Sequence, residues 1–382
     1  MSVRLAHLHH HTGWGMGESS ITDVENQASA GDLSAQLRMA RTLLADGELE
    51  ASRNWLRRAA ETGPADIKLE LADNLLTFIP SEVSEGIGWA RAAAEAGSGE
   101  AAHRLAVLAA EGVGGQQSWS DALDHLRRAA ALGHRVAQAE LAGLSGDWSL
   151  AKMLLGGDGD PPDSGRLGHG VDLVSWLKVP AVQILLLSPR VVSVPGFLSP
   201  GECDWMIERA RPYLKRAQTF DPRTGLAQVQ EGRNHSCIGF NVVRSDVVFA
   251  IVRARMALLT GHSPMGFEDT SVLHYAPGEQ FAPHYDFIEA DTPAAQREIA
   301  SSGQRAVTFL AYLNEGYEGG ETAFPVLGRS FKGKKGHALF YDNALADGSP
   351  DRRTLHAGTP LKRGEKWLMS QWIRSRPAWL SQ

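Results

Sequence analysis

The sequence predicts a multi-domain α + β protein, in which an α-helical solenoid is followed by a jelly roll of antiparallel strands with supporting helices. Two observations carry this prediction. The first part of the chain repeats an alanine-rich pattern, whereas the second half holds short β-branched and aromatic runs bounded by Gly, Pro and Asp. Repeats of about 35 residues form helical solenoids, and many evenly spaced strands form sandwiches or jelly rolls.

The composition is that of an ordinary globular chain without a basic surplus. Of the 382 residues, 43% are hydrophobic and 21% are charged, which argues against extended disorder. The net charge of −6 leaves no positive field with which to hold nucleic acid or an anionic membrane surface. We therefore expect neither nucleic acid nor a membrane among the partners.

The cytoplasm is the expected location. The most apolar stretch, residues 171–187, is interrupted by Asp172, Lys178 and Pro180, so it does not predict a membrane span. The first residues, MSVRLAHLHHHTGWG, lack the apolar core and cleavage site of a signal peptide. Two cysteines cannot build a disulfide framework, which is typical of a protein from a reducing compartment.

Four parts are predicted along the chain. Residues 1–21 have no regular pattern and are expected to be disordered, and residues 22–155 form the helical repeats. Residues 156–170 contain six glycines and two prolines, which is the composition of a linker. Residues 171–382 form the β-rich domain.

A nine-residue motif marks the second helix of each repeat. It occurs as WLRRAAETG at 55–63, WARAAAEAG at 89–97 and HLRRAAALG at 125–133. With Gly31 closing an earlier unit, the final glycines are 32, 34 and 36 residues apart. The alanines allow paired helices to approach closely, and each glycine is expected to supply the left-handed residue that ends its helix.

These units resemble Sel1-like repeats of the tetratricopeptide superfamily. The usual G-x-G loop is missing around residues 64–84, so we expect that unit to be distorted. The resemblance implies that a concave face binds protein or peptide. A scaffold or oligomerisation surface is the alternative, and the sequence does not choose between the two.

The second half changes its hydrophobic period from helix to strand. Two helices are predicted, at 199–214 and 246–260. The main predicted strands lie at 191–194, 306–313, 337–341 and 366–373.

Three side chains of this half could hold a metal ion. His284 and Asp286 alternate on a predicted strand and therefore point to one face. His356, 70 residues beyond Asp286, could complete a set of two histidines and one carboxylate. Such a set leaves three open positions on iron(II), enough for a bidentate cosubstrate and O₂. Taken alone, each residue is more often a structural strand histidine or a surface aspartate than a metal ligand.

A cosubstrate with a second, buried carboxylate needs a cation to receive it. Lys366 shares a strand face with Leu368 and Trp372, a neighbourhood that suits a carboxylate pocket better than an exposed lysine. Tyr275 and Thr308 could add hydroxyl donors.

At this point the chain resembles the prolyl 4-hydroxylase branch of the iron(II)/2-oxoglutarate-dependent oxygenases, over roughly residues 180–378. The matching segments are LHYAPGEQFAPHYD at 273–286, GQRAVTFLAYLN at 303–314, EGGETAFP at 318–325, KGHALFY at 335–341, LHAGTP at 355–360 and GEKW at 364–367. The resemblance implies a double-stranded β-helix, or jelly-roll, oxygenase domain, with His284, Asp286 and His356 as iron(II) ligands.

The resemblance also implies a cosubstrate site. Lys366 matches the residue that pairs with the 5-carboxylate of 2-oxoglutarate. Tyr275 and Thr308 match residues that hydrogen-bond that carboxylate, and Trp372 matches a tryptophan that lines the pocket.

The implied activity is that of a prolyl 4-hydroxylase-like dioxygenase, which couples decarboxylation of 2-oxoglutarate to hydroxylation of a C–H bond. Iron(II), 2-oxoglutarate and O₂ are implied, with ascorbate to restore oxidised iron. The leading substrate is a prolyl residue of a protein or peptide held by the repeats. One alternative is the same chemistry on a free amino acid or other metabolite, with the repeats forming a homo-oligomer. The other is a non-enzymatic adaptor or an oxygen or 2-oxoglutarate sensor.

Overall fold

The computed structural model describes residues 21–78, 80–158, 167–217, 219–221, 226–228 and 232–376. The chain divides into two compact units, residues 1–105 and 106–382. The division falls inside helix α6 (Gly99–Glu111), so the helices after it pack with the β-rich part. The linker expected at 156–170 stays a prediction, because residues 159–166 lie outside the described residues, as do residues 1–20 of the expected disordered N-terminus.

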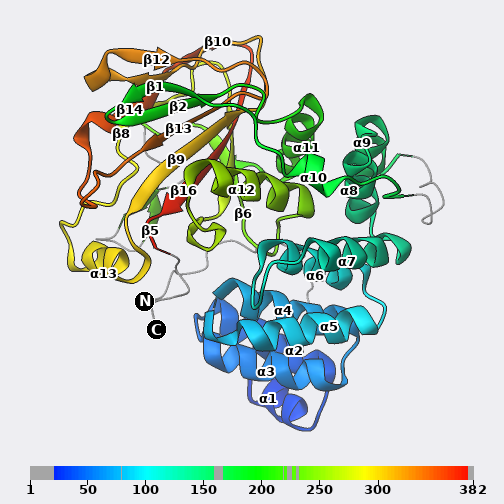
Figure 1. Cartoon of the computed structure of the whole chain (residues 1–382). Coiled ribbons are helices and arrows are strands. Elements are labelled where there is room, and N and C mark those ends of the chain that lie inside the picture. The colour runs from blue at the N-terminus through cyan, green and yellow to red at the C-terminus, as the bar shows by residue number, and fades with distance from the viewer. Residues whose placement is uncertain are drawn as a thin grey trace. The chain divides into compact units, whose positions relative to one another are not determined.

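Successive helices pack on one another in the first unit, with α2 against α3 and α4 against α5 (Figure 1). Buried alanines such as Ala35, Ala59 and Ala90 allow this close approach. The helices are α1 (Ile21–Ser29), α2 (Leu33–Ala45), α3 (Leu49–Thr62), α4 (Ala65–Phe78), the 3-10 turn η1 (Pro80–Glu82), α5 (Val83–Glu95) and the first part of α6.

The glycines that close the repeats behave as predicted at three of four places. Gly31, Gly97 and Gly133 have φ angles of 96°, 95° and 85°, in the left-handed region. Gly63 differs, with φ −76° and ψ 165°. Pro64 follows it, and a residue before proline is held in the extended region. The prediction of a left-handed glycine is therefore wrong in this repeat.

The second unit contains further helices and the β-rich part. Ser199 forms a capping box with Glu202 at the start of α11, which confirms one of the two predicted helices, and α12 confirms the other. The helices and turns are α7 (Trp119–Ala131), α8 (Arg135–Leu144), α9 (Trp148–Gly156), α10 (Leu173–Trp176), α11 (Pro200–Ala210), η2 (Arg211–Tyr213), α12 (Val247–Thr260), η3 (Pro264–Gly266), α13 (Pro293–Ser302), η4 (Pro325–Leu327) and η5 (Arg352–Thr354).

An eight-stranded antiparallel sheet contains all four predicted strands. Its order is β1 (Gln183–Leu187), β2 (Arg190–Val194), β13 (Ala338–Asp342), β9 (Arg305–Tyr312), β16 (Lys366–Arg374), β7 (Thr270–Tyr275), β6 (Ser236–Phe240) and β3 (Lys215–Arg216). A four-stranded sheet has the order β12 (Arg329–Phe331), β11 (Thr322–Phe324), β14 (His356–Gly358) and β8 (Phe281–His284). Two short pairs join β10 (Glu318–Gly319) to β15 (Leu361–Arg363) and β4 (Thr219–Asp221) to β5 (Leu226–Gln228).

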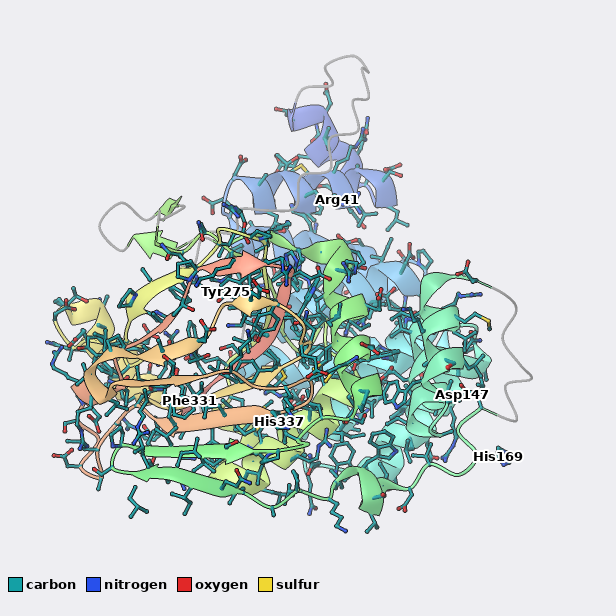
Figure 2. The ribbon with its side chains drawn as sticks, turned by 90° about the horizontal axis from the view of Figure 1, so that it is seen from above. Arg41, Asp147, His169, Tyr275, Phe331 and His337 are labelled. Atoms are coloured by element: carbon teal, nitrogen blue, oxygen red, sulfur yellow. The ribbon has the colours of Figure 1, made fainter. Side chains whose placement is uncertain are left out.

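The hydrophobic core of this part lies between the two larger sheets, as expected for a jelly roll. Tyr275 of the larger sheet and Phe331 of the smaller one mark its two sides (Figure 2). The other face of the larger sheet packs on helices, where Phe249 of α12 stacks on Phe240 of β6 with ring centroids 4.3 Å apart. No helix within the described ranges is both long and apolar enough to cross a membrane.

Candidate active site

Two neighbouring strands bring the predicted histidine ligands together. His284 ends β8, His356 begins β14, and the two residues are directly paired across the strands. Their ring centroids lie 4.2 Å apart. Because cross-strand partners on one face of a sheet are neighbours, the register of β8 and β14 alone places the two imidazoles side by side.

Asp286 completes the cluster two residues after His284. Its carboxylate lies between the two rings, with Oδ1 3.5 Å from Nε2 of His284 and Oδ2 3.4 Å from Nε2 of His356. One ligand atom from each of the three residues lies within 4.8 Å of the others. The three predicted metal-binding residues therefore meet at one point.

The two rings are oriented by the backbone. Nδ1 of His284 lies 2.8 Å from the carbonyl oxygen of Ala282, and Nδ1 of His356 lies 3.1 Å from that of Thr354. A carbonyl oxygen only accepts, so each Nδ1 donates its proton, and each Nε2 is the nitrogen that faces Asp286. Metal-binding histidines are commonly fixed in this way.

The charges suit a metal ion as well. Burial tends to raise the pKa of Asp286, but the neighbouring imidazoles of His356 and His284 and the hydrogen bond from Thr308 outweigh it and lower that pKa below its usual range. Burial lowers the pKa of His356 to about 4, so this ring is neutral at pH 7. A carboxylate together with two imidazoles is the donor set of non-haem iron(II) sites, and these residues fit that ion.

Lys366 lines the same cavity as the three residues. It is 1% exposed, and its Nζ donates to the carbonyl oxygen of Gly320 at 2.8 Å. Nζ lies 5.0 Å and 5.9 Å from the ring centroids of Tyr275 and Tyr312. Within the described part of the chain it forms no ion pair, and burial lowers its pKa to about 8. A buried ammonium without an anion is costly, so this place fits a ligand carboxylate.

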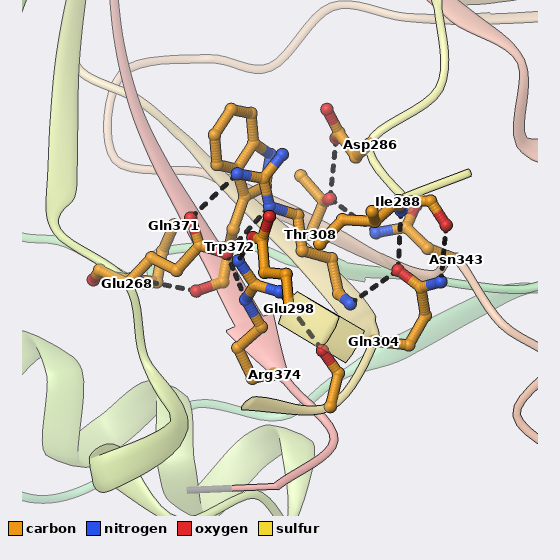
Figure 3. A network of polar contacts seen from close by, with 12 residues as sticks. Glu268, Asp286, Ile288, Glu298, Gln304, Thr308, Asn343, Gln371, Trp372 and Arg374 are labelled. Atoms are coloured by element: carbon orange, nitrogen blue, oxygen red, sulfur yellow. Dashed lines mark hydrogen bonds and ion pairs between the residues drawn. The ribbon is translucent and has the colours of Figure 1, made fainter. Parts of the chain in front are cut away.

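Tyr275 and Thr308, which the sequence predicts to hydrogen-bond the same carboxylate as Lys366, lie in two different places. Tyr275 lies beside Lys366 and lines the cavity. Thr308 instead donates to Oδ2 of Asp286 at 2.7 Å and accepts from Nδ2 of Asn343 at 2.8 Å (Figure 3). The structure therefore corrects the predicted place of Thr308, whose hydroxyl orients the carboxylate of Asp286.

Trp372 lines the cavity at a different position from Lys366. The two residues are six positions apart on β16, which corresponds to about 20 Å along a strand. The two residues nevertheless line one cavity, so the contact of Trp372 with the cosubstrate stays a prediction.

Three residues with hydroxyl groups near the site were not predicted from the sequence. Tyr312 and Thr322 share a hydrogen bond of 2.9 Å near Lys366, and Tyr341 donates to Oδ2 of Asp286 at 3.2 Å. The alternation of β9, which puts Tyr312 on the face of Thr308, could have found the first. Nothing in the local sequence marks Tyr341, which pairs with Thr308 from β13.

Comparison with known proteins agrees with this site. Residues 270–374 match the 2OG-Fe(II) oxygenase superfamily. The chain is 35% identical over 191 residues to prolyl 4-hydroxylase subunit alpha-1 of Rattus norvegicus. This match covers 49% of this chain and 35% of the rat protein. It is 32% identical over 208 residues to prolyl 4-hydroxylase 1 of Arabidopsis thaliana. This match covers 51% of this chain and 72% of the plant protein.

Two solved structures are similar to separate parts of the chain. The viral collagen prolyl hydroxylase of Paramecium bursaria Chlorella virus-1 is 31% identical and covers 48% of this chain and 94% of its own, with a TM-score of 0.37. A Sel1 repeat protein from Oxalobacter formigenes is 26% identical and covers 32% of this chain and 97% of its own, with a TM-score of 0.28. The chain spans about a third of the length of the rat relative. On the match to the plant enzyme, the chain belongs to the prolyl 4-hydroxylase family of 2OG-Fe(II) oxygenases.

Proposed function

We propose that this protein is an iron(II)- and 2-oxoglutarate-dependent dioxygenase that hydroxylates a prolyl residue of a protein or peptide. One observation carries the proposal. A single cavity is lined both by the cluster of His284, Asp286 and His356 and by the buried Lys366, which forms no ion pair with any residue that the structure describes. The superfamily uses iron(II), 2-oxoglutarate and O₂, as the sequence predicted.

The residues in and around the cavity have three different roles. His284, Asp286 and His356 would hold iron(II), which with 2-oxoglutarate and O₂ supplies the oxidising power for C–H hydroxylation. Lys366 would bind the 5-carboxylate of 2-oxoglutarate, with Tyr275 and Tyr312 packed around its ammonium group. Thr308 and Tyr341 keep Asp286 oriented through their hydrogen bonds.

The substrate class rests on the relatives. Both curated relatives named above are prolyl 4-hydroxylases, and the viral relative is a collagen prolyl hydroxylase. A protein or peptide substrate follows from that likeness, and we assign its binding to the helical repeats. We also propose a cytoplasmic location, on the ground of the cysteine usage, and ascorbate as the reductant that restores oxidised iron.

The first test needs no substrate. Anaerobic protein is loaded with iron(II), 2-oxoglutarate is added, and the visible charge-transfer band is recorded, with His284→Ala as the control. The band should form in the unmutated protein alone. Iron-loaded protein without a band would contradict the proposal and favour an adaptor.

The second test separates a peptide from a metabolite. Poly-L-proline and free L-proline are incubated with the loaded full-length protein, and products are analysed for the mass of one added oxygen atom. We expect the added oxygen in the peptide. Turnover of free proline alone would support the metabolite alternative, with the repeats as an oligomerisation scaffold.

A further inference from the structure

A carboxylate of helix α6 is inserted into the β-rich part of the second unit. Glu111 is the last residue of α6, and its side chain is 9% exposed. It faces Arg253 of α12, which is 13% exposed, with Nε of the arginine 3.0 Å and 3.1 Å from the two carboxylate oxygens. This geometry is a largely desolvated ion pair, not a surface contact.

A second nitrogen of the Arg253 guanidinium forms hydrogen bonds with residues of, and next to, the strands that line the cavity. Its Nη1 donates to the carbonyl oxygen of Glu268 at 3.1 Å, to Oγ1 of Thr270 at 3.3 Å and to Oε1 of Gln371 at 3.2 Å. Thr270 begins β7, and Gln371 lies in β16. One guanidinium thus connects α6 to two strands and to the backbone of Glu268.

Glu268 continues the connection to Trp372. Its carboxylate accepts from Arg305 at 2.7 Å and 3.0 Å, and the Cζ atom of that guanidinium lies over the indole of Trp372, 3.7 Å from the ring centroid. Gln371 adds a second connection, because its Nε2 donates to the carbonyl oxygen of Trp372 at 2.9 Å. Both the ring and the backbone of Trp372 are therefore fixed by groups that Arg253 fixes.

Two further charged residues belong to this network. Glu268 also forms an ion pair with Arg374, whose Nε lies 2.5 Å from its carboxylate, and Arg374 pairs with Glu298 of α13 at 2.6 Å. Three guanidinium groups thus contact three carboxylates: Arg253, Arg305 and Arg374 against Glu111, Glu268 and Glu298. Without the charge of Glu111, Arg253 loses the carboxylate with which it pairs, while its hydrogen bond to the carbonyl oxygen of Glu268 and the neighbouring carboxylate of Asp269 remain.

We infer that Glu111 is a positioning residue for the substrate end of the active-site cavity. Through Arg253 and Glu268 it sets Arg305, and through Arg305 it sets the face that Trp372 presents to the cavity. This inference rests on the proposed function, in which the substrate enters the cavity that Trp372 lines together with the metal-binding residues. Helix α6 thereby contributes to the oxygenase site although it contains no residue that lines it.

The test reads the environment of Trp372 directly. Full-length protein is labelled with 5-fluorotryptophan, the ¹⁹F resonance of Trp372 is assigned with Trp372→Phe, and the spectrum of Glu111→Gln is compared with that of the unmutated protein. The resonance of Trp372 should shift, and those of distant tryptophans should stay. Arg305→Lys, which keeps the charge but loses the planar stack, should move the same resonance.

A matched control replaces a carboxylate at another contact between a repeat helix and an oxygenase helix. Glu208 of α11 lies 4.0 Å from Lys152 of α9, away from this network, so Glu208→Gln should leave the resonance of Trp372 in place. Should Glu111→Gln fail to fold, Glu111→Asp, which keeps the charge and retracts it, should give a smaller shift of the same signal.

The kinetic counterpart uses poly-L-proline. Glu111→Gln should raise the KM for the peptide several-fold and leave the charge-transfer band with iron(II) and 2-oxoglutarate unchanged. An unmoved Trp372 resonance, or an equal shift of all tryptophans, overturns the inference. A missing band in the unmutated protein contradicts the proposed function instead, so the two failures are distinct.

Discussion

Two carboxylates are buried in different regions of the second unit, and their charges are controlled in opposite ways. Glu140 of α8 is fully buried and accepts from the backbone N–H of Val247 at the start of α12, at 2.6 Å. Burial raises its pKa to about 8. Asp286 is equally buried, but its pKa is lowered because His356, His284 and Thr308 face it.

The difference shows what separates a metal ligand from a structural cap. Burial alone moves a carboxyl group toward its neutral form. Glu140 has mainly backbone amides to oppose that tendency, whereas Asp286 has two imidazoles and a hydroxyl. Only the second arrangement keeps an anion ready for a cation at neutral pH.

Removing the charge of Asp286 should have the largest effect. Asp286→Asn keeps the shape but loses the anion, so iron(II) affinity should fall by more than about 100-fold and hydroxylation should be abolished. Isothermal titration and the charge-transfer band measure both. Iron(II) affinity within threefold of the unmutated value would mean that Asp286 is no ligand.

Lys366 should show the next effect, and a pH dependence. Its pKa of about 8 means that the ammonium form is fully present below pH 8 and is lost above it. The affinity for 2-oxoglutarate should therefore be constant below pH 8 and fall about tenfold per pH unit above it. Lys366→Arg should remove that fall, whereas Lys366→Ala should weaken binding at every pH. A flat profile in the unmutated protein would contradict this role.

Thr308 should give a smaller effect that sharpens the comparison. Thr308→Val removes one of the donors that distinguish Asp286 from Glu140. Iron(II) affinity should fall about tenfold, since second partners of metal ligands contribute about 10–100-fold. The KM for 2-oxoglutarate should change little, because Thr308 contacts Asp286 and not Lys366. A selective rise of that KM would restore the role that the sequence assigned.

Glu140 should affect stability and its pH dependence, not activity. Its folded-state pKa is raised, so the native state binds an extra proton between about pH 4.5 and 8, and this group destabilises the fold as pH rises through that range. Glu140→Gln should remove this dependence, which amounts to on the order of 5 kcal/mol between the two limits. Thermal unfolding at several pH values measures it. An unchanged pH profile would mean that Glu140 is ionised at no cost.

The sequence predicted those features that depend on local pattern. The alternation of His284 and Asp286, the alanine-rich repeats and the strands β9 and β16 follow from spacing alone. The place of Thr308 did not, because its hydroxyl is used by Asp286, a residue from another strand region. Gly63 was missed although Pro64 gave the signal. Glu111 and Glu140 carry no local signal, since only the packing of helices on α12 gives them their partners.

The pairing of His284 with His356 has a consequence for how the protein matures. The two residues are 72 positions apart and become neighbours only when β14 docks on β8. A growing chain has no metal site until residue 356 has been synthesised and β14 has docked on β8, so iron can be captured only after this part of the fold closes. Iron capture then stabilises the completed fold by mass action, and the metal content of a preparation reports how much of the chain has folded.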